Sequence, residues 1–448
     1  MIGDGLRRAR SGLPIKLEPA SRRGWLWCMK TEFLEIGLRD VWSQQFRFGL
    51  GADERARHLY LVGMTGTGKS TLIANLVRQD IERGAGLTLI DPHGDLAEAV
   101  YDMVPTRRID DIVIMDPTDH AHVAGFNPFY RVPLDERPRI TSNLVETFKH
   151  IWSDSWGPRL EHILRNTARL VLDSPDPMRP TLISVARVLV ERDFRERSLT
   201  YCTDHQVERF FRNEFDRWND RFVAEALAPV QNKLGAVLAN PYVRNILGQW
   251  RPTIDLADII RRERILIVRA PKGALGADQA SLLGSLIVSG LMQAAMAAPG
   301  DRVPHHLYID EFQNFTTDSF ATILAEARKF QLTLTIGHQF TEQLPLNIRA
   351  AVFGNVGTIV SFRVGADDAD RLAHEFRDLP AARFCDLKRG EVIVKLMADG
   401  GTPMTFVGQT VVGDGGIGTS HRVIAKNRRA HTRPRKQVEA RLSRWLRR

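Results

Sequence analysis

The sequence predicts an α/β protein with a mostly parallel sheet, interrupted by an all-helical inserted domain. Short apolar, β-branched runs alternate with helical segments over residues 51–134, and the alternation returns over residues 253–412. Strands buried between two helical layers have this appearance, because neither face of the sheet meets water. Between these halves, residues 135–252 carry aromatic and aliphatic side chains at helical spacing, without a convincing strand.

Two further segments flank the predicted core. Residues 1–50 form an N-terminal segment without a clear pattern, amphipathic at best and interrupted by charge. Residues 413–448 form a basic C-terminal tail. From residue 417 onward, eleven Lys or Arg and one acid give +10, whereas the whole chain carries +9, so the other residues sum to −1. The tail is expected to be a solvated arm or an arm that binds a polyanion.

The end of the tail, "QVEARLSRWLRR", is compatible with an amphipathic helix. Its apolar side would carry Val438, Leu442, Trp445 and Leu446. A basic amphipathic helix suits nucleic acid, and it also suits an anionic membrane surface or a partner protein.

The composition favours a cytoplasmic protein. The three cysteines are widely scattered, without a disulfide framework or metal-ligand spacing, and the basic N-terminus has no apolar run behind it. Residues 280–300 carry no charge and are long enough to cross a bilayer. Serines, a glutamine and glycines dilute this stretch, and strand-like runs flank it, so we expect a buried helix. We predict no transmembrane segment of its own, with peripheral binding at the inner membrane as the alternative location.

Residues 63–70 read G-M-T-G-T-G-K-S and match the phosphate-binding loop in full. The loop follows a strand-like run and opens a helical one, where backbone N–H groups and the helix dipole favour anions. Lys69 is expected to bring charge to the β- and γ-phosphates, and the Ser70 hydroxyl to ligate Mg²⁺. We predict ATP and Mg²⁺ as cofactors, with the nucleotide held by Gly63, Thr65, Gly66, Thr67, Gly68, Lys69, Ser70 and Thr71.

Two acids end the apolar run "HLYIDEF". Asp310 is expected to hold the magnesium through water, and Glu311 to orient or deprotonate the attacking water. Capping of the following turn is the alternative. Gln339 follows another buried run, "LTLTIGH", at the edge of a parallel sheet where ligands bind. Its amide is expected to sense the γ-phosphate or to position the water, and the alternative is that it only caps the strand end.

The segment "AEARKF", residues 325–330, lies between these two strands. Glu326 and Lys329 have the spacing of a surface ion pair. Arg328 is the candidate for an arginine finger that reaches the nucleotide of a neighbouring subunit, and spacing alone does not decide this.

The motifs "GMTGTGKST", "LTLIDPHGD", "GFNPF", "LYIDEFQNF", "AEARKF" and "GHQF" occur in this order, with the helical block after the third. Over roughly residues 51–412 the sequence resembles the FtsK–HerA superfamily of hexameric motor ATPases. Within it, the chain is similar to the coupling proteins of conjugative type IV secretion systems, the TraG/TraD type.

The resemblance implies a RecA-like P-loop domain that hydrolyses ATP in a homo-hexamer. It places Lys69, Ser70, Asp310 and Glu311 in the two Walker motifs, Gln339 at the polar sensor and Arg328 at the finger. The helical block would recognise DNA or its processing complex. The signature "DPHGD", Asp91 to Asp95, has no derived role beyond a tight turn.

The function implied is an ATP-driven DNA translocase that moves or recruits DNA for conjugative or mobile-element transfer. A relaxase or relaxosome component and a membrane channel would be its partners. Members of the family usually begin with transmembrane helices that anchor them to the channel. Because we predict no transmembrane segment here, docking to a channel stays open. Two alternatives remain: a cytosolic DNA-processing motor of the HerA type, and an ATP-driven protein-export or assembly ATPase. Whether the DNA is single- or double-stranded is left open.

Overall fold

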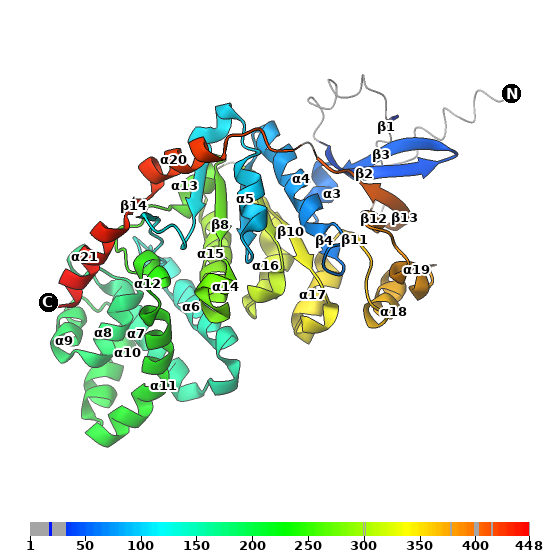
Figure 1. Ribbon diagram of the computed structural model, residues 1–448. Helices are drawn as coiled ribbons and strands as arrows, with labels where there is room; N and C mark the ends of the chain where they lie inside the picture. Colours follow the sequence, from blue (N-terminus) through cyan, green and yellow to red (C-terminus); the bar gives the residue numbers. More distant parts are fainter. Residues whose placement is uncertain are drawn as a thin grey trace.

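The computed structural model describes residues 18–19, 33–298, 300, 302–376, 379–397, 403–413 and 415–447. In this part of the chain, a 12-stranded sheet has the order β1-β3-β2-β13-β12-β11-β4-β10-β9-β5-β8-β6. Helices cover both of its faces, and a separate group of helices projects from the end of the sheet that carries β6 (Figure 1).

The strands from β11 to β6 are parallel. Nearly all of their residues are buried, which explains why they read as apolar runs. Their bounds are β4 Leu59–Val62, β5 Gly86–Asp91, β6 Ile112–Met115, β8 Ile265–Arg269, β9 His305–Ile309, β10 Leu332–His338 and β11 Thr358–Ser361.

One face of the sheet is covered by α4 (Lys69–Arg83) and α5 (Asp95–Tyr101), whose apolar residues form one buried cluster with the strands. The opposite face is covered by α15 (Ala277–Ala297), α16 (Ser319–Glu326) and α17 (Leu346–Asn355) within a second cluster. Each face of the sheet therefore has its own helical layer, as in the α/β arrangement that the sequence predicts.

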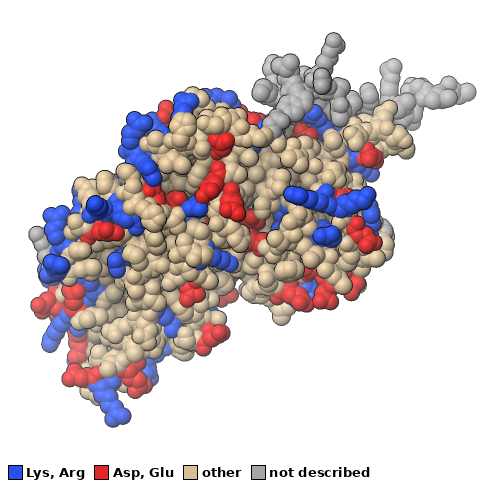
Figure 2. Space-filling view, in the orientation of Figure 1, with Lys and Arg blue, Asp and Glu red and all other residues tan. Residues whose placement is uncertain are grey.

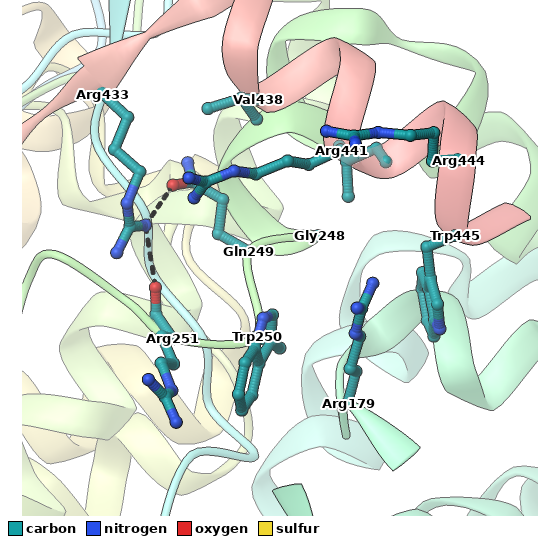
Figure 3. Close-up of a pocket in the computed structure, with 11 residues that line it drawn as sticks. Arg179, Gly248, Gln249, Trp250, Arg251, Arg433, Val438, Arg441, Arg444 and Trp445 are labelled. Atoms are coloured by element: carbon teal, nitrogen blue, oxygen red, sulfur yellow. Dashed lines mark hydrogen bonds between the residues drawn. The ribbon is translucent and has the colours of Figure 1, made fainter. Parts of the chain in front are cut away.

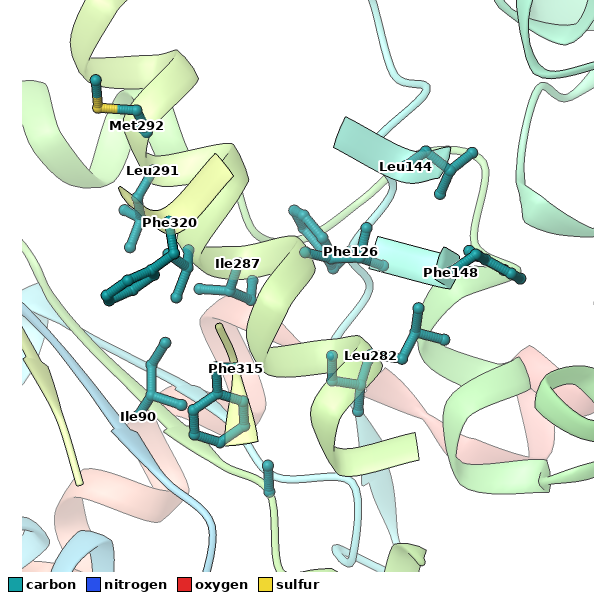
Figure 4. Packing of buried hydrophobic residues seen from close by; sticks show 14 of the residues in the cluster. Ile90, Phe126, Leu144, Phe148, Leu282, Ile287, Leu291, Met292, Phe315 and Phe320 are labelled. Atoms are coloured by element: carbon teal, nitrogen blue, oxygen red, sulfur yellow. The ribbon is translucent and has the colours of Figure 1, made fainter. Parts of the chain in front are cut away.

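Helix α15 is the uncharged stretch weighed above as a membrane span. It is the one helix in the described part of the chain that is long and apolar enough to cross a membrane, and 67% of its most apolar window is buried inside the protein. Figure 4 shows Ile287 of this helix on the side of Phe315 and Phe320, and Leu282 on the side toward Phe148. The expectation of a core helix agrees with this packing.

Residues 135–252, the expected inserted domain, are all described and contain helices and no strand. Phe211 and Phe215 are buried and pack against each other with ring centroids 5.5 Å apart and the rings tilted at 58°, so these aromatics belong to the core of the domain. The helices are α6 Arg137–Ile151, α7 Pro158–Asp173, α8 Leu182–Val190, α9 Arg192–Leu199, α10 His205–Arg209, α11 Asp220–Ala239 and α12 Pro241–Leu247.

The structure corrects the boundary expected at residue 50. Strands β2 (Leu34–Val41) and β3 (Gln44–Leu50) form an antiparallel hairpin, and β2 pairs with β13 (Pro403–Thr410). β13 in turn pairs with β12 (Glu391–Met397) and so joins the hairpin to the parallel strands. Most of the preceding N-terminal segment lies outside the described residues, apart from β1 (Glu18–Pro19), which pairs with β3.

The structure also corrects the expectation of a solvated C-terminal arm. Helix α20 (Ser420–His431) buries Val423 against the sheet's helical layer. Its Asn427 accepts a hydrogen bond from the Ile114 N–H (2.8 Å) and donates one to the Ile114 carbonyl (3.2 Å). The amide therefore replaces a neighbouring strand at the sheet edge, where β6 would otherwise leave these groups unpaired.

The last helix, α21 (Arg435–Leu446), packs on the inserted domain beside α12. Val438, Leu442 and Trp445 are buried on one side, whereas Leu446 is 47% exposed. Between α20 and α21, the short strand β14 (Arg433–Pro434) pairs with β7 (His122–Val123). The basic tail is thus a folded strap across both parts of the molecule (Figure 1).

Candidate nucleotide-binding site

The phosphate loop connects β4 to α4 at the carboxyl edge of the parallel strands. Gly68 has φ 121°, a conformation that side chains rarely adopt. At Gly63 a β-carbon would lie 2.5 Å from the Phe362 Cβ, so glycine is required by the close approach of the neighbouring strand. Helix α4 begins at Lys69, which places its positive N-terminal end at the loop.

Lys69 is buried beneath this loop, where its ammonium donates to the carbonyls of Gly63 (2.6 Å) and Met64 (3.2 Å). Burial lowers the pKa of Lys69, and the nearby carboxylates of Glu311 and Asp310 oppose that shift. The ammonium therefore lies inside the loop that would hold the phosphates, paired only with neutral carbonyls.

Ser70 and Asp310 come together from α4 and the end of β9. The Ser70 hydroxyl donates to the Asp310 carboxylate, with Oγ and Oδ2 2.8 Å apart. Burial raises the pKa of Asp310, and the hydrogen bond from Ser70 opposes this. Oxygen ligands of this kind suit Mg²⁺, and a hydroxyl next to a carboxylate at a phosphate loop fits the ion that accompanies a nucleoside triphosphate.

Glu311 adopts a left-handed backbone conformation, φ 49° and ψ 53°, which is costly for a residue with a side chain. Its carboxylate accepts hydrogen bonds from the amides of Gln339 (2.5 Å) and Gln313 (2.8 Å). It makes no side-chain cap to the turn that follows. Glu311 therefore does not cap this turn, and its carboxylate is oriented by two amides.

Gln339 follows β10 and links the acid to the loop. Its amide donates to Glu311, and its carbonyl accepts a hydrogen bond from the Thr65 hydroxyl (3.0 Å). Thr67 secures the loop from within by donating to the Met64 carbonyl (2.7 Å). Gln339 thus bridges the two motifs that sequence reasoning identified separately.

Arg328 does not join this site within one chain. It lies in the turn Ala327–Phe330, exposed, just before β10 begins at Leu332. The site lies at the other end of β10, roughly 20 Å away at about 3.3 Å per residue. Any contact with nucleotide would therefore involve another subunit. Lys329 and Glu326 form the surface pair that their spacing allowed (3.6 Å).

Arg389 is a site residue that sequence reasoning missed. Together with the loop, Asp310, Glu311 and Gln339, it lines a cavity of about 170 Å³. The turn before β12 carries it there, because the Gly390 N–H donates to the Thr67 carbonyl (3.0 Å). No local motif marks this arginine, since its place depends on two segments that are far apart in the sequence.

The "DPHGD" segment forms the tight turn that was considered for it. The Asp91 carboxylate accepts hydrogen bonds from the backbone N–H groups of His93 (2.8 Å) and Ala97 (2.9 Å). This turn brings His93 to the lining of the same cavity. A second cavity of about 470 Å³ continues between α4 and α5, beside Ser70 and Asp310.

Comparison of the sequence with known proteins gives a family model and a related protein. The family model "Helicase HerA, central domain" matches residues 42–137. The type 4 coupling protein DotL of Legionella pneumophila is 22% identical over 335 residues, which cover 62% of this chain and 43% of DotL. The chain therefore spans less than half the length of that relative.

Solved structures share the fold at low sequence identity. The conjugative coupling protein TrwBΔN70 has a TM-score of 0.63 at 15% identity, over 90% of this chain and 94% of that one. TrwB with the non-hydrolysable ATP analogue ADPNP has a TM-score of 0.62 at 17% identity, over 90% and 97% of the two chains. VirB4 of Thermoanaerobacter pseudethanolicus has a TM-score of 0.55 at 13% identity, over 85% and 97%.

These matches confirm the predicted fold, a RecA-like P-loop domain with a helical insertion. Residues 42–137 resemble the central domain of the HerA helicase, and the chain is similar to type IV secretion coupling proteins, as the sequence predicts. The loop, its lysine and the serine–aspartate pair are the groups that ATP and Mg²⁺ require.

Proposed function

We propose that this chain is an ATP-driven hexameric motor that moves or recruits DNA for conjugative or mobile-element transfer. The observation that carries the proposal is the combination of a complete phosphate-loop site with a large helical domain inserted before β8, in a fold shared with TrwB over 90% of the chain. A helical domain on a RecA-like motor is suited to recognising the cargo while the sheet domain hydrolyses ATP.

In the proposed cycle, Glu311 orients and deprotonates the attacking water, and Gln339 holds that carboxylate in place. When bound, Mg²⁺ would be held by Ser70 and Asp310, and would neutralise charge on the phosphates. Because Gln339 also binds Thr65, a rearrangement of the loop on nucleotide binding would be passed to β10.

Arg328 is assigned as a finger in trans. Its exposed position near the amino end of β10 suits a subunit interface. Arginine fingers increase the rate of hydrolysis by a factor on the order of 10³ to 10⁵. Mixing Arg328→Ala with Lys69→Ala tests this, because one subunit supplies an intact pocket and the other an intact finger. Activity should partly return in mixed hexamers, and none returning would contradict the assignment. Lys329→Ala, in the same turn, is the matched control and should hydrolyse normally.

The proposed DNA function is tested by hydrolysis rate and particle mass with and without DNA. DNA should stimulate hydrolysis by the wild-type chain and favour hexamers. Normal hydrolysis that no nucleic acid stimulates would favour the export or assembly ATPase instead. A relaxase, a channel component and a peripheral place at the inner membrane belong to the same proposal, and co-purification with those partners tests them.

A cytosolic DNA-processing motor of the HerA type is the second candidate. The match of residues 42–137 to the central domain of that helicase favours it. DNA-end processing with a nuclease partner, and no requirement for a relaxase, would distinguish this motor from a coupling protein.

A further inference from the structure

A cleft of about 410 Å³ lies between α21 and the end of the inserted domain (Figure 3). We call it the tail cleft. Guanidinium groups line it from both sides, and none of the described residues that line it is Asp or Glu. Its arginines are Arg179 and Arg251 from the inserted domain and Arg433, Arg441 and Arg444 from the C-terminal segment.

Two indoles lie among these cations. Trp250 is half-buried, and the Arg251 guanidinium stands 4.3 Å from its ring centroid. Trp445 is buried and lies over Arg187 at 5.0 Å. Figure 3 shows the Trp250 and Trp445 rings standing on either side of Arg179. Of the two, Trp250 offers the more accessible aromatic surface.

The cations of the cleft have different partners from the cations of the preceding helix, α20. In α20, Lys426 pairs with Asp110 and Arg428 pairs with Asp119, so these cations attach the tail to the sheet domain. In the cleft, Arg433 donates instead to neutral oxygens, the Gln249 side chain (2.5 Å) and the Arg251 carbonyl (2.8 Å). Its charge therefore remains available to an anion.

Arg251, Arg441 and Arg444 have little compensation for their charge. Arg441 and Arg444 are exposed. The carboxylate of Asp176 lies 3.7 Å from Arg251 at the exposed rim, where an ion pair contributes little. Lys and Arg side chains follow the course of α20 and α21 over the surface (Figure 2). A cluster of planar guanidinium groups with a carboxylate only at its exposed rim is suited to phosphates, which these groups bind through pairs of hydrogen bonds.

We propose that the tail cleft binds a single-stranded nucleic acid, with phosphates on the arginines and an unpaired base against Trp250. Only an unpaired base can present its face to an indole in a cleft, whereas a duplex presents its backbone and groove edges. The inference rests on the proposed DNA function and names the form of nucleic acid that this site takes.

The packing of α21 argues against an anionic membrane as the ligand of the cleft. Insertion into a membrane would require the apolar side of the helix. Val438, Leu442 and Trp445 on that side are already buried against the inserted domain.

The test measures binding of a labelled oligothymidylate and of a matched duplex to the full chain over a salt series. Arg441→Gln with Arg444→Gln should flatten the slope of log affinity against log salt by about 1.4, since each phosphate contact on a single strand contributes about 0.7. The matched control is Arg429→Gln with Lys436→Gln, which removes the same charge from exposed tail positions outside the cleft. The control should change the slope by less than half as much.

Trp250→Leu should weaken single-strand binding by roughly 5- to 140-fold, the range of base–aromatic stacking, and Trp250→Phe should restore most of it. Urea unfolding midpoints check that each variant is folded. Equal effects of the two double variants, or equal losses for duplex and single strand, would overturn the proposal. The proposal would also be overturned if the cleft variants lost binding to phosphatidylglycerol vesicles and still bound oligothymidylate as the wild type does.

Failure of this inference can be told apart from failure of the proposed function. If DNA stimulates hydrolysis but the cleft variants bind oligothymidylate as the wild type does, only the tail cleft assignment falls. If the wild type hydrolyses ATP and binds no nucleic acid, both fall.

Discussion

Replacing Leu442 with Ala should destabilise the protein far more than the same replacement at Leu446, one turn further along α21. Leu442 is 7% exposed, and at Gly248 of the inserted domain a β-carbon would come within 3.0 Å of its Cδ2. Leu446 is 47% exposed. Truncating a buried leucine costs about 2 to 5 kcal/mol, whereas a largely exposed one costs about 1 kcal/mol or less. Both changes are Leu to Ala in one helix, and Ala has the higher helix propensity, so a loss of propensity accounts for neither effect.

The assay is equilibrium urea unfolding of the full chain without nucleotide, followed by tryptophan fluorescence. Leu442→Ala should lower the midpoint of the transition that includes the inserted domain, and Leu446→Ala should leave it nearly unchanged. Equal midpoints for the two variants would refute the packing of α21 and return the tail to the status of a solvated arm.

The same packing changes how a tail deletion would be interpreted. Removing residues 417–448 would test an arm that binds DNA, but it would also remove the buried Val423 and the Asn427 amide that pairs with Ile114. A buried backbone group left without a partner costs about 1 to 3 kcal/mol. Loss of DNA binding in such a deletion would therefore report on folding as much as on contacts with DNA.

Lys69→Ala should lose ATP binding and hydrolysis, whereas Glu311→Gln should keep its affinity for nucleotide and stall turnover, because an amide cannot take the proton from water. Nucleotide titration measures the affinity and phosphate release measures the turnover. Normal turnover in Glu311→Gln would show that this carboxylate does not take part in the chemistry. Arg389→Ala should raise the KM for ATP severalfold, and Lys388→Ala, an exposed neighbour outside the cavity lining, should not; matching KM values for the two variants would argue against a role for Arg389. Lowering the pH from 6.5 toward 4 should destabilise the fold by up to about 3 kcal/mol through His58, because burial lowers its pKa to about 4 and the unfolded chain takes up the proton first. The stability is present above pH 6.5 and is lost as the pH falls; His58→Gln should unfold with a weaker pH dependence over that range, and an unchanged dependence would exclude His58 as its source.

The fold class and the candidate nucleotide site could be predicted from the sequence, because both depend on short contiguous patterns. The phosphate loop is one uninterrupted run from Gly63 to Ser70, and its glycines are required by local backbone geometry. Asp310 and Gln339 each follow a buried strand. Since parallel strands present their carboxyl ends at one edge, the order of elements brings the acid and the amide near the loop without any knowledge of side-chain packing.

The contacts between segments that are distant in the sequence could not be predicted from it. Arg389 reaches the phosphate loop through a backbone hydrogen bond between Gly390 and Thr67, and nothing in either local sequence specifies that pairing. The hairpin from Leu34 to Leu50 is held in place by pairing with β13, where Leu38 lies opposite Gln409. Charge composition indicated an arm in the tail, but burial of Val438, Leu442 and Trp445 depends on a complementary surface of the inserted domain. A local pattern encodes the conformation and the apolar side of a segment, whereas its partner is selected by the shape and free hydrogen-bonding groups of the surface it meets after the chain has folded.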